Sequence, residues 1–184
     1  ERLDQLSSDD FHTTGSVVRL HQPGRSAGKL QFIAEGLQRF RIVKWLSQEP
    51  PYLAQVEYPQ EEKKANEDEV RAYAMAIINT IKELLPLNPL YSEELKYFLN
   101  RFGPNEPSPL TDFAASLTTA NKTELQEVLE TFPVIQRMKK VLVLLKKELE
   151  VAKLQTRIRQ QVEEQMSEQQ RKFFLREQLK EIQK

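Results

Sequence analysis

The C-terminal part of the chain constrains the fold more than any other feature. From Pro133 to Lys184 it runs for 52 residues, and after Pro133 it contains neither proline nor glycine. Proline fits the first turn of a helix, so the sequence predicts one continuous helix over 133–184. At about 1.5 Å per residue this helix would be roughly 78 Å long, which is longer than a domain of this size. Part of it is therefore expected to project.

Apolar residues divide this expected helix into two halves. The first half has a helical apolar stripe that favours packing in a core, formed by Val134, Met138, Val141, Leu142, Leu145, Leu149 and Ala152. The second half keeps one apolar residue in every three or four, at Leu154, Ile158, Val162 and Met166. That spacing among charged and amide residues is typical of a coiled coil. We expect this half to meet a partner helix, a neighbouring subunit or water.

Three consecutive apolar residues follow, at Phe173, Phe174 and Leu175. On a helix they spread over about 200° of the circumference, at about 100° per residue. A two-stranded coiled coil cannot bury all three, so at least one should contact another domain, another subunit or a client protein. With Met166 they are the candidate contact residues, and a structural contact is favoured over a client site.

The segment 61–132 also has helical periodicity. Asn66 with Glu69 predicts an N-cap and a capping box, and Pro86 predicts the end of that helix. Further short helices are expected from Ser92 to Phe102, from Ser108 with Pro109, and from Thr123 with Gln126. Phe113, Leu117, Leu125, Val128 and Leu129 are expected to point inward.

Before residue 60 the apolar period is two, as in half-buried strands. Leu30, Phe32 and Ala34 share one face, while Pro23, Gly24 and Gly28 indicate a hairpin turn. About four antiparallel strands are predicted. Such a sheet would have exposed edges, so further strands are expected before Glu1.

The predicted fold class is α+β, mostly α. It comprises a partial antiparallel β-domain (1–60), a helical bundle (61–132) and a long projecting helix (133–184). Only 5 glycines beside 29% charged residues also favour helix as the bulk structure.

The composition removes most kinds of catalytic site. The chain has no cysteine, which excludes thiolate nucleophiles and zinc-finger sites. The stretch from Gly24 to Leu30 fails as a phosphate loop on glycine spacing, on Leu30 and on the strand expected after it. His12 and His21 lack clustered carboxylates. No catalytic, cofactor or metal site is therefore expected, and no apolar run is long enough to cross a membrane.

Nucleic-acid binding is disfavoured but stays open. Arg39, Arg41 and Lys44 lie among Phe40 and Trp45. Proteins that bind single-stranded nucleic acids combine basic residues with aromatic rings on which the bases stack. The 27 basic residues are balanced by 27 acidic ones, whereas nucleic-acid binders carry a basic excess. The favoured interpretation places Arg39 and Arg41 on a polar outer face of a strand.

Two segments carry a family resemblance. They are the strand segment Glu35-Gly36-Leu37-Gln38-Arg39 and the helical run from Gln165 through Arg171-Lys172-Phe173-Phe174-Leu175-Arg176-Glu177-Gln178 to Lys184. With the order of strands, bundle and long helix, the chain from Gly15 to Lys184 resembles the N-terminal region of the ATP-dependent Lon protease.

The resemblance implies a PUA-like β-domain, a helical bundle and a long helix that leads to an AAA+ ATPase domain and a Ser–Lys protease domain. No position here matches a Walker motif or a catalytic Ser or Lys, so this fragment would not be an enzyme, and ATP and Mg would belong to the parent. The implied partners are unfolded or damaged proteins and further copies in a cytoplasmic, bacterial-type homohexamer. The alternatives are a purely structural oligomerisation module and a nucleic-acid-binding PUA-like module.

Overall fold

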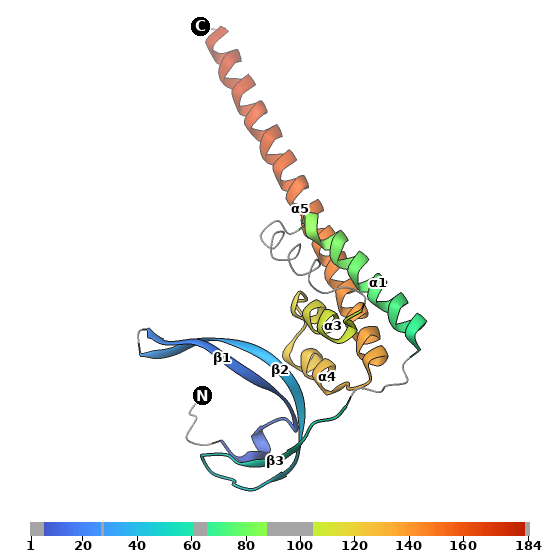
Figure 1. The fold of residues 1–184 in the computed structure, drawn as a ribbon. Helices are drawn as coiled ribbons and strands as arrows, with labels where there is room; N and C mark the ends of the chain where they lie inside the picture. Colours follow the sequence, from blue (N-terminus) through green and yellow to red (C-terminus); the bar gives the residue numbers. More distant parts are fainter. Residues whose placement is uncertain (1–5, 27, 61–65, 88–104, 183–184) are drawn as a thin grey trace. The chain divides into compact units, whose positions relative to one another are not determined.

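A computed structural model describes residues 6–26, 28–60, 66–87 and 105–182. The helix expected from Ser92 to Phe102 lies outside these residues. The contacts divide the chain into two compact units (Figure 1). The first contains Glu1–Ala65 with Asn121–Arg137, and the second contains Asn66–Ala120 with Met138–Lys184.

The first unit contains a three-stranded antiparallel sheet in the order β1-β2-β3. Its strands are β1 (Thr14–Ser26), β2 (Lys29–Trp45) and β3 (Ala54–Glu57). The sheet has three strands and not the predicted four, because β2 continues through Gly36 without a break. Gly36 pairs with Val18 next to a register shift between Val17 and Val18. The glycine thus marks an irregularity within the hairpin and not the end of a strand.

The hairpin turn lies later in the sequence than Pro23 and Gly24. The last paired residues are Ser26 and Lys29, and Gly28 has a φ of 76° that favours glycine. Pro23 lies inside β1 at a second register shift, between His21 and Gly24. Proline has no N–H for the ladder, so it is accommodated at a bulge.

An aromatic cluster lies where the N-terminal segment meets the β2–β3 connection. The ring centroids of Phe11 and Trp45 are 5.7 Å apart, and those of Phe11 and Tyr52 are 5.0 Å apart. The Tyr52 hydroxyl donates to the carbonyl of Leu6 at 2.6 Å, just before the 3-10 helix η2 (Ser8–Asp10). These contacts fix the N-terminal segment on the sheet.

Helix α4 (Lys122–Glu130) belongs to the same unit as the sheet. Its N-cap is Asn121, which forms a reciprocal capping box with Glu124, so the helix begins before the predicted Thr123. The Gln126 side chain donates to the carbonyl of Thr14 at 3.1 Å and ties the helix to β1. Val128 is buried, as predicted, whereas Leu125 is exposed.

The second unit is a helical bundle. Helix α1 (Glu67–Leu84) begins at Asn66, whose side chain accepts from the backbone N–H groups of Asp68 and Glu69, which confirms the predicted N-cap. It ends in the short 3-10 helix η3 (Leu85–Leu87) around Pro86. Helix α3 (Pro107–Ser116) starts just before the predicted Ser108. Its buried residues are Leu110, Thr111, Ala114 and Ala115, and not the predicted Phe113 and Leu117.

The long helix is confirmed as α5 (Val134–Ile182), with 49 residues. It runs parallel to α1, because Lys139 pairs with Glu69 and Lys153 pairs with Glu83 at the same sequence offset. Figure 1 shows α5 continuing beyond the end of α1. The core of this unit consists of Ala74, Ile77, Ile78, Ile81, Leu84, Leu110, Ala114, Ala115, Met138, Val141, Leu145 and Leu149.

Candidate functional site

The predicted contact residues all lie on the exposed half of α5. From Arg157 to Arg176 every side chain is exposed. Met166 is 57% exposed, Phe173 and Phe174 are each 67% exposed, and Leu175 is 51% exposed. Met166 and Phe173 are seven residues apart and share a face, while Phe174 and Leu175 each turn about 100° further around the helix. The four residues therefore do not form one compact patch.

The two series of apolar residues predicted for the two halves of α5 lie on different faces of the helix. Met138, Val141, Leu145 and Leu149 are buried on the first face. The second face is exposed and is formed by Val143, Val151, Leu154, Ile158, Val162 and Met166. Leu154 follows Leu149 by five residues, which turns it about 140° away from the packed face. The five-residue step from Leu149 to Leu154 therefore already indicates in the sequence that the second series lies on another face.

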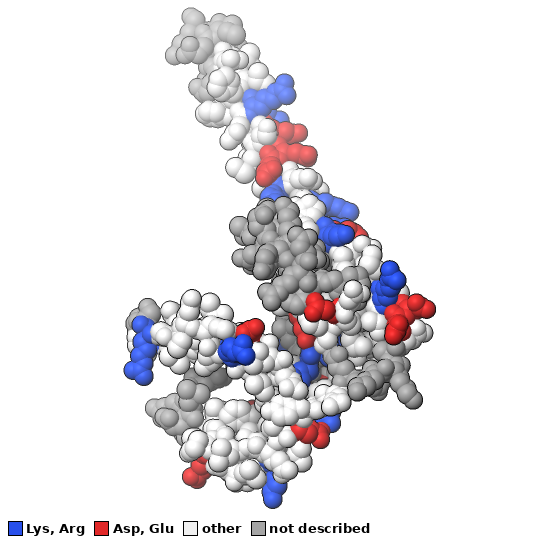
Figure 2. Space-filling view, in the orientation of Figure 1, with Lys and Arg blue, Asp and Glu red and all other residues white. Residues whose placement is uncertain are grey.

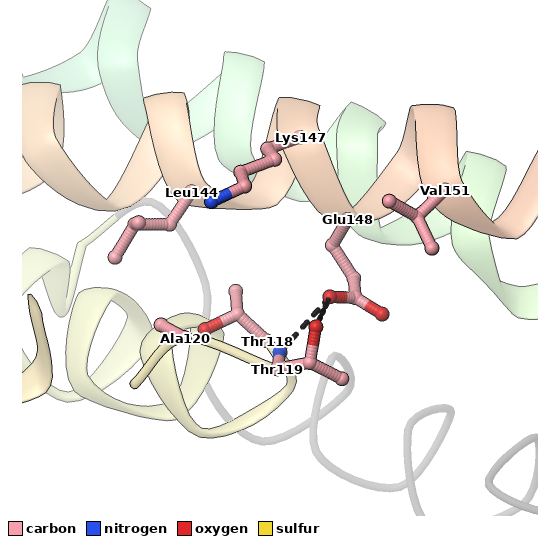
Figure 3. Close-up of a pocket in the computed structure, with 7 residues that line it drawn as sticks. All are labelled: Thr118, Thr119, Ala120, Leu144, Lys147, Glu148 and Val151. Carbon is pink, nitrogen blue, oxygen red and sulfur yellow. Dashed lines mark hydrogen bonds between the residues drawn. The ribbon is translucent and has the colours of Figure 1, made fainter. Parts of the chain in front are cut away.

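A small hollow lies between α5 and the end of α3 (Figure 3). Its volume is about 80 Å³, and it is lined by Thr118, Thr119, Ala120, Leu144, Lys147, Glu148 and Val151. The Glu148 carboxylate accepts from the Thr119 backbone N–H at 2.9 Å and from its hydroxyl at 2.6 Å. The hollow has room for only a few water molecules. The Glu148 contact therefore anchors the segment after α3 and does not form a substrate site.

The β1–β2 hairpin also presents apolar side chains, which corrects the prediction of half-buried strands. Leu20 pairs with Ala34 and Val18 with Gly36, so Phe32 lies on their face. Leu30, Phe32 and Ala34, expected to be half-buried, are all exposed. The exposed large apolar residues of β1 and β2 are Val18, Leu20, Leu30, Phe32, Ile33, Leu37 and Val43.

The opposite face of the hairpin carries a charged group. Arg19 pairs with Glu35 across the strands, and His21 pairs with Ile33. The Glu35 carboxylate lies 2.8 Å from Nε2 of His21 and 3.8 Å from the guanidinium of Arg19. These contacts place the His21 ring in a surface hydrogen-bonding group with Glu35. Over the described part of the chain, no three His, Cys, Asp or Glu residues gather closely enough to hold a metal ion.

The basic and aromatic residues of β2 make contacts within the first unit. Nε of Arg39 donates to the carbonyl of Leu129 at the end of α4, at 3.2 Å. The guanidinium of Arg41 lies 4.7 Å from the Phe132 ring centroid and 3.2 Å from a Glu57 oxygen. The predicted polar outer face is wrong in this respect, because these arginines face α4 and the residues after it.

The surface charges are mixed in sign. Figure 2 shows acidic and basic side chains interspersed on the visible face and separated by uncharged surface. Lys139 of α5 lies 3.2 Å from Glu69 and 5.4 Å from the Tyr73 ring centroid. The hydrogen bond to Glu69, with a smaller effect of Tyr73, raises the pKa of Lys139 above its ordinary value. Among the described helices, none is both long and apolar enough to span a membrane.

Comparison with known proteins decides the family. Residues 2–147 match the model of the ATP-dependent protease La (LON) substrate-binding domain. The chain belongs to this family. The resemblance seen in the sequence is thereby confirmed, and so is the fold class.

Similar full-length proteins are Lon proteases of bacteria. Lon protease 2 of Hydrogenovibrio crunogenus is 53% identical over 175 residues, which is 95% of this chain and 20% of that protein. Lon protease of Magnetococcus marinus is 50% identical over 173 residues, 92% of this chain and 21% of that protein. The chain therefore spans about a fifth of the length of these relatives.

A solved structure supports the fold. The N-terminal domain of Mycobacterium avium complex Lon protease has a TM-score of 0.61 and 22% identity, over 76% of this chain and 73% of that one. The match to the Lon substrate-binding family covers residues 2–147 and therefore includes the exposed β1–β2 hairpin. Met166 and Phe173–Leu175 lie beyond that match, on the part of α5 that the full-length relatives share.

Proposed function

We propose that this Lon substrate-binding domain captures misfolded or regulatory proteins for an ATP-dependent Lon-type protease. The observation that carries the proposal is the number of large apolar side chains that α5 and the hairpin leave exposed. Unfolded proteins differ from folded ones in the apolar side chains that they expose. Exposed apolar side chains are therefore suited to select them.

The catalytic work is assigned to the rest of the parent protein. The described residues contain no cluster for a metal ion, and no residue of the chain matches a Walker motif or a Ser–Lys dyad. ATP, Mg and peptide hydrolysis would then belong to the ATPase and protease domains of a cytoplasmic homohexamer. The substrate-binding domain would deliver the client and contribute to assembly and gating.

Client contact is assigned to Phe173, Phe174 and Leu175, with Met166 on the face of Phe173. Their exposure on a single helix makes them accessible from several directions. Replacing Phe173, Phe174 and Leu175 together by serine should abolish binding to reduced casein, measured by light scattering. The side chains make no core contact, so the variant should keep its helical circular dichroism.

The matched comparison is a triple serine variant of the hairpin at Leu20, Phe32 and Ile33, which are also exposed. Loss of casein binding in the α5 variant alone supports the assignment. Loss in the hairpin variant alone would transfer the client site to the sheet. Unchanged binding and self-association in the α5 variant would contradict the proposed role of these residues.

A second candidate function is structural, with α5 mainly setting the geometry of an oligomer. It is favoured by the second apolar face of α5, which is exposed along several turns. Deleting residues 153–184 should then abolish self-association and leave casein binding by the remaining chain intact. Retained self-association in that deletion would exclude this candidate.

A further inference from the structure

The exposed face of α5 has a defined width and direction. Leu154, Ile158 and Val162 follow each other at four-residue intervals, and each step turns the series about 40° around the helix. Val151 and Met166 extend the face at its two ends. All five side chains are exposed, while the opposite face is packed only as far as Leu149. A second helix lying along this face would meet apolar side chains over about four turns.

The charges along this part of α5 are distributed unevenly. Residues 146–159 contain five basic and two acidic side chains, whereas residues 160–170 contain three acidic and no basic ones. The sign changes close to residue 160, near the middle of the exposed face. Two copies in parallel would place like-charged segments beside each other. Two copies in opposite directions would place the basic segment against the acidic one.

One flank of the apolar face shows this complementarity residue by residue. Glu150, Arg157, Glu164 and Arg171 recur every seven residues, so they share that flank, together with Lys153 and Glu168. In an antiparallel pair, a flank meets the same flank of the partner helix. With the centre between residues 160 and 161, Arg157 faces Glu164 of the second copy. In the same register Lys153 faces Glu168, and Glu150 faces Arg171.

The apolar residues fit a register that differs from this one by half a residue. Ile158 lies opposite Val162 of the second copy and Leu154 lies opposite Met166 when the pair is centred on residue 160. Val151 lies at the inner end of this register, where it also lines the hollow beside Thr118 and Thr119. The last ion pair between α1 and α5 is that of Lys153 with Glu83 at 3.7 Å, and Lys153 also lies 3.5 Å from Glu150. Among the described residues, no ion pair joins α1 to α5 beyond Lys153.

We propose that α5 pairs with α5 of a second copy of this chain in antiparallel orientation, centred close to residue 160. The apolar face from Val151 to Met166 forms the seam, and the alternating charges of one flank set direction and register. This inference rests on the second candidate function, the structural one, and specifies its partner and geometry.

Thiol cross-linking tests the orientation, because the chain has no cysteine of its own. Leu154→Cys and Met166→Cys are made in separate chains of different tag size, and both positions are exposed. Under mild oxidation, the mixture should give the mixed disulfide dimer, and neither variant should cross-link efficiently alone. Cross-linking of each variant with itself would show a parallel pair and overturn the proposal. No cross-linking in any combination would also overturn it.

Charge exchange tests the register in the unmodified seam. Arg157→Glu should weaken self-association roughly tenfold in sedimentation equilibrium, because two symmetric contacts become repulsive. The double variant Arg157→Glu with Glu164→Arg should restore most of the affinity. A double variant as weak as the single one would overturn the register.

The two proposals fail separately. Casein binding by the Arg157→Glu variant tests client capture, whereas cross-linking tests pairing. Loss of the mixed disulfide with intact casein binding would remove only the antiparallel pair.

Discussion

At the scale of single residues, the close approach of the Phe40 ring to the backbone of β1 leaves no room for a side chain at position 15. A Cβ atom added to Gly15 would lie 2.6 Å from Cζ of the Phe40 ring. Gly15 and Phe40 are paired residues of β1 and β2, so the ring packs directly over the glycine. The absence of a side chain at Gly15 is thus a packing requirement.

We therefore expect Gly15→Ala to destabilise the first unit. The ring of Phe40 must move, and such overpacking typically costs about 1–3 kcal/mol. Thermal unfolding followed by tryptophan fluorescence measures the effect through Trp45. The matched control is Gly24→Ala in the same strand, where an added Cβ meets nothing within 4 Å. Equal stability of the two variants would contradict this packing argument.

Lys139 carries a pH-dependent prediction. Its pKa lies above the ordinary value of 10.5, chiefly because its ammonium group donates a hydrogen bond to Glu69. A raised lysine pKa means that the stabilising contact is fully present below the ordinary value and is lost as the pH rises through the raised value.

Glu69→Gln should thus lower the pKa of Lys139 toward 10.5, and its destabilising effect should disappear at the highest pH. NMR titration of the lysine side-chain carbons measures this shift. Glu67→Gln, in the same first turn of α1, is the control and should leave the titration of Lys139 unchanged. A Lys139 pKa that does not respond to Glu69→Gln would show that the pair is not formed in solution.

At the scale of elements, the carboxylate of Glu148 holds α5 to the segment after α3. Glu148 accepts two hydrogen bonds from Thr119 beside the small hollow. Val151 also lines this hollow, although it belongs to the exposed face of α5. The packed and exposed faces of the helix thus meet at this point.

Glu148→Ala should lower the free energy of unfolding by about 1–2 kcal/mol, because it leaves both Thr119 donors without this acceptor. Urea unfolding followed by circular dichroism measures the change. Glu163→Ala on the exposed half of α5 is the control and should change stability by less than about 0.5 kcal/mol. Equal effects of the two substitutions would show that the contact with Thr119 contributes nothing.

At the scale of the whole molecule, the chain forms two units that each have their own packed residues. The single tryptophan, Trp45, lies in the first unit and contacts Phe11 and Tyr52. Most helical residues lie in the second unit, where Met138 is fully buried. Fluorescence and helical circular dichroism therefore report on different units.

Met138→Ala should shift the helical transition strongly and the fluorescence transition much less. Truncating a buried methionine typically costs about 2–5 kcal/mol. Thermal scans with both probes on the same sample measure the difference, and Met75→Ala, at an exposed position of α1, is the control. Equal shifts in both probes would show that the two units unfold as one.

The sequence predicted several elements closely because their signals are local. Asn66 caps α1 through its own side chain, and Pro133 precedes a helix that no proline or glycine interrupts. The division at residues 60 and 132 stays a prediction. The packed residues of α3 were mispredicted, because several faces of a short helix are apolar enough to turn inward.

The sequence by itself determined the long helix, the antiparallel strands, the absence of cysteine chemistry and the Lon resemblance. Each depends on residue type, on spacing along the chain or on neighbours a few residues apart. Only the tertiary structure decided which apolar residues are covered. Leu145 and Ile158 each have apolar residues four positions before and after them, yet one is buried and the other exposed. Burial depends on whether a distant segment lies opposite, and local periodicity carries no information about that segment.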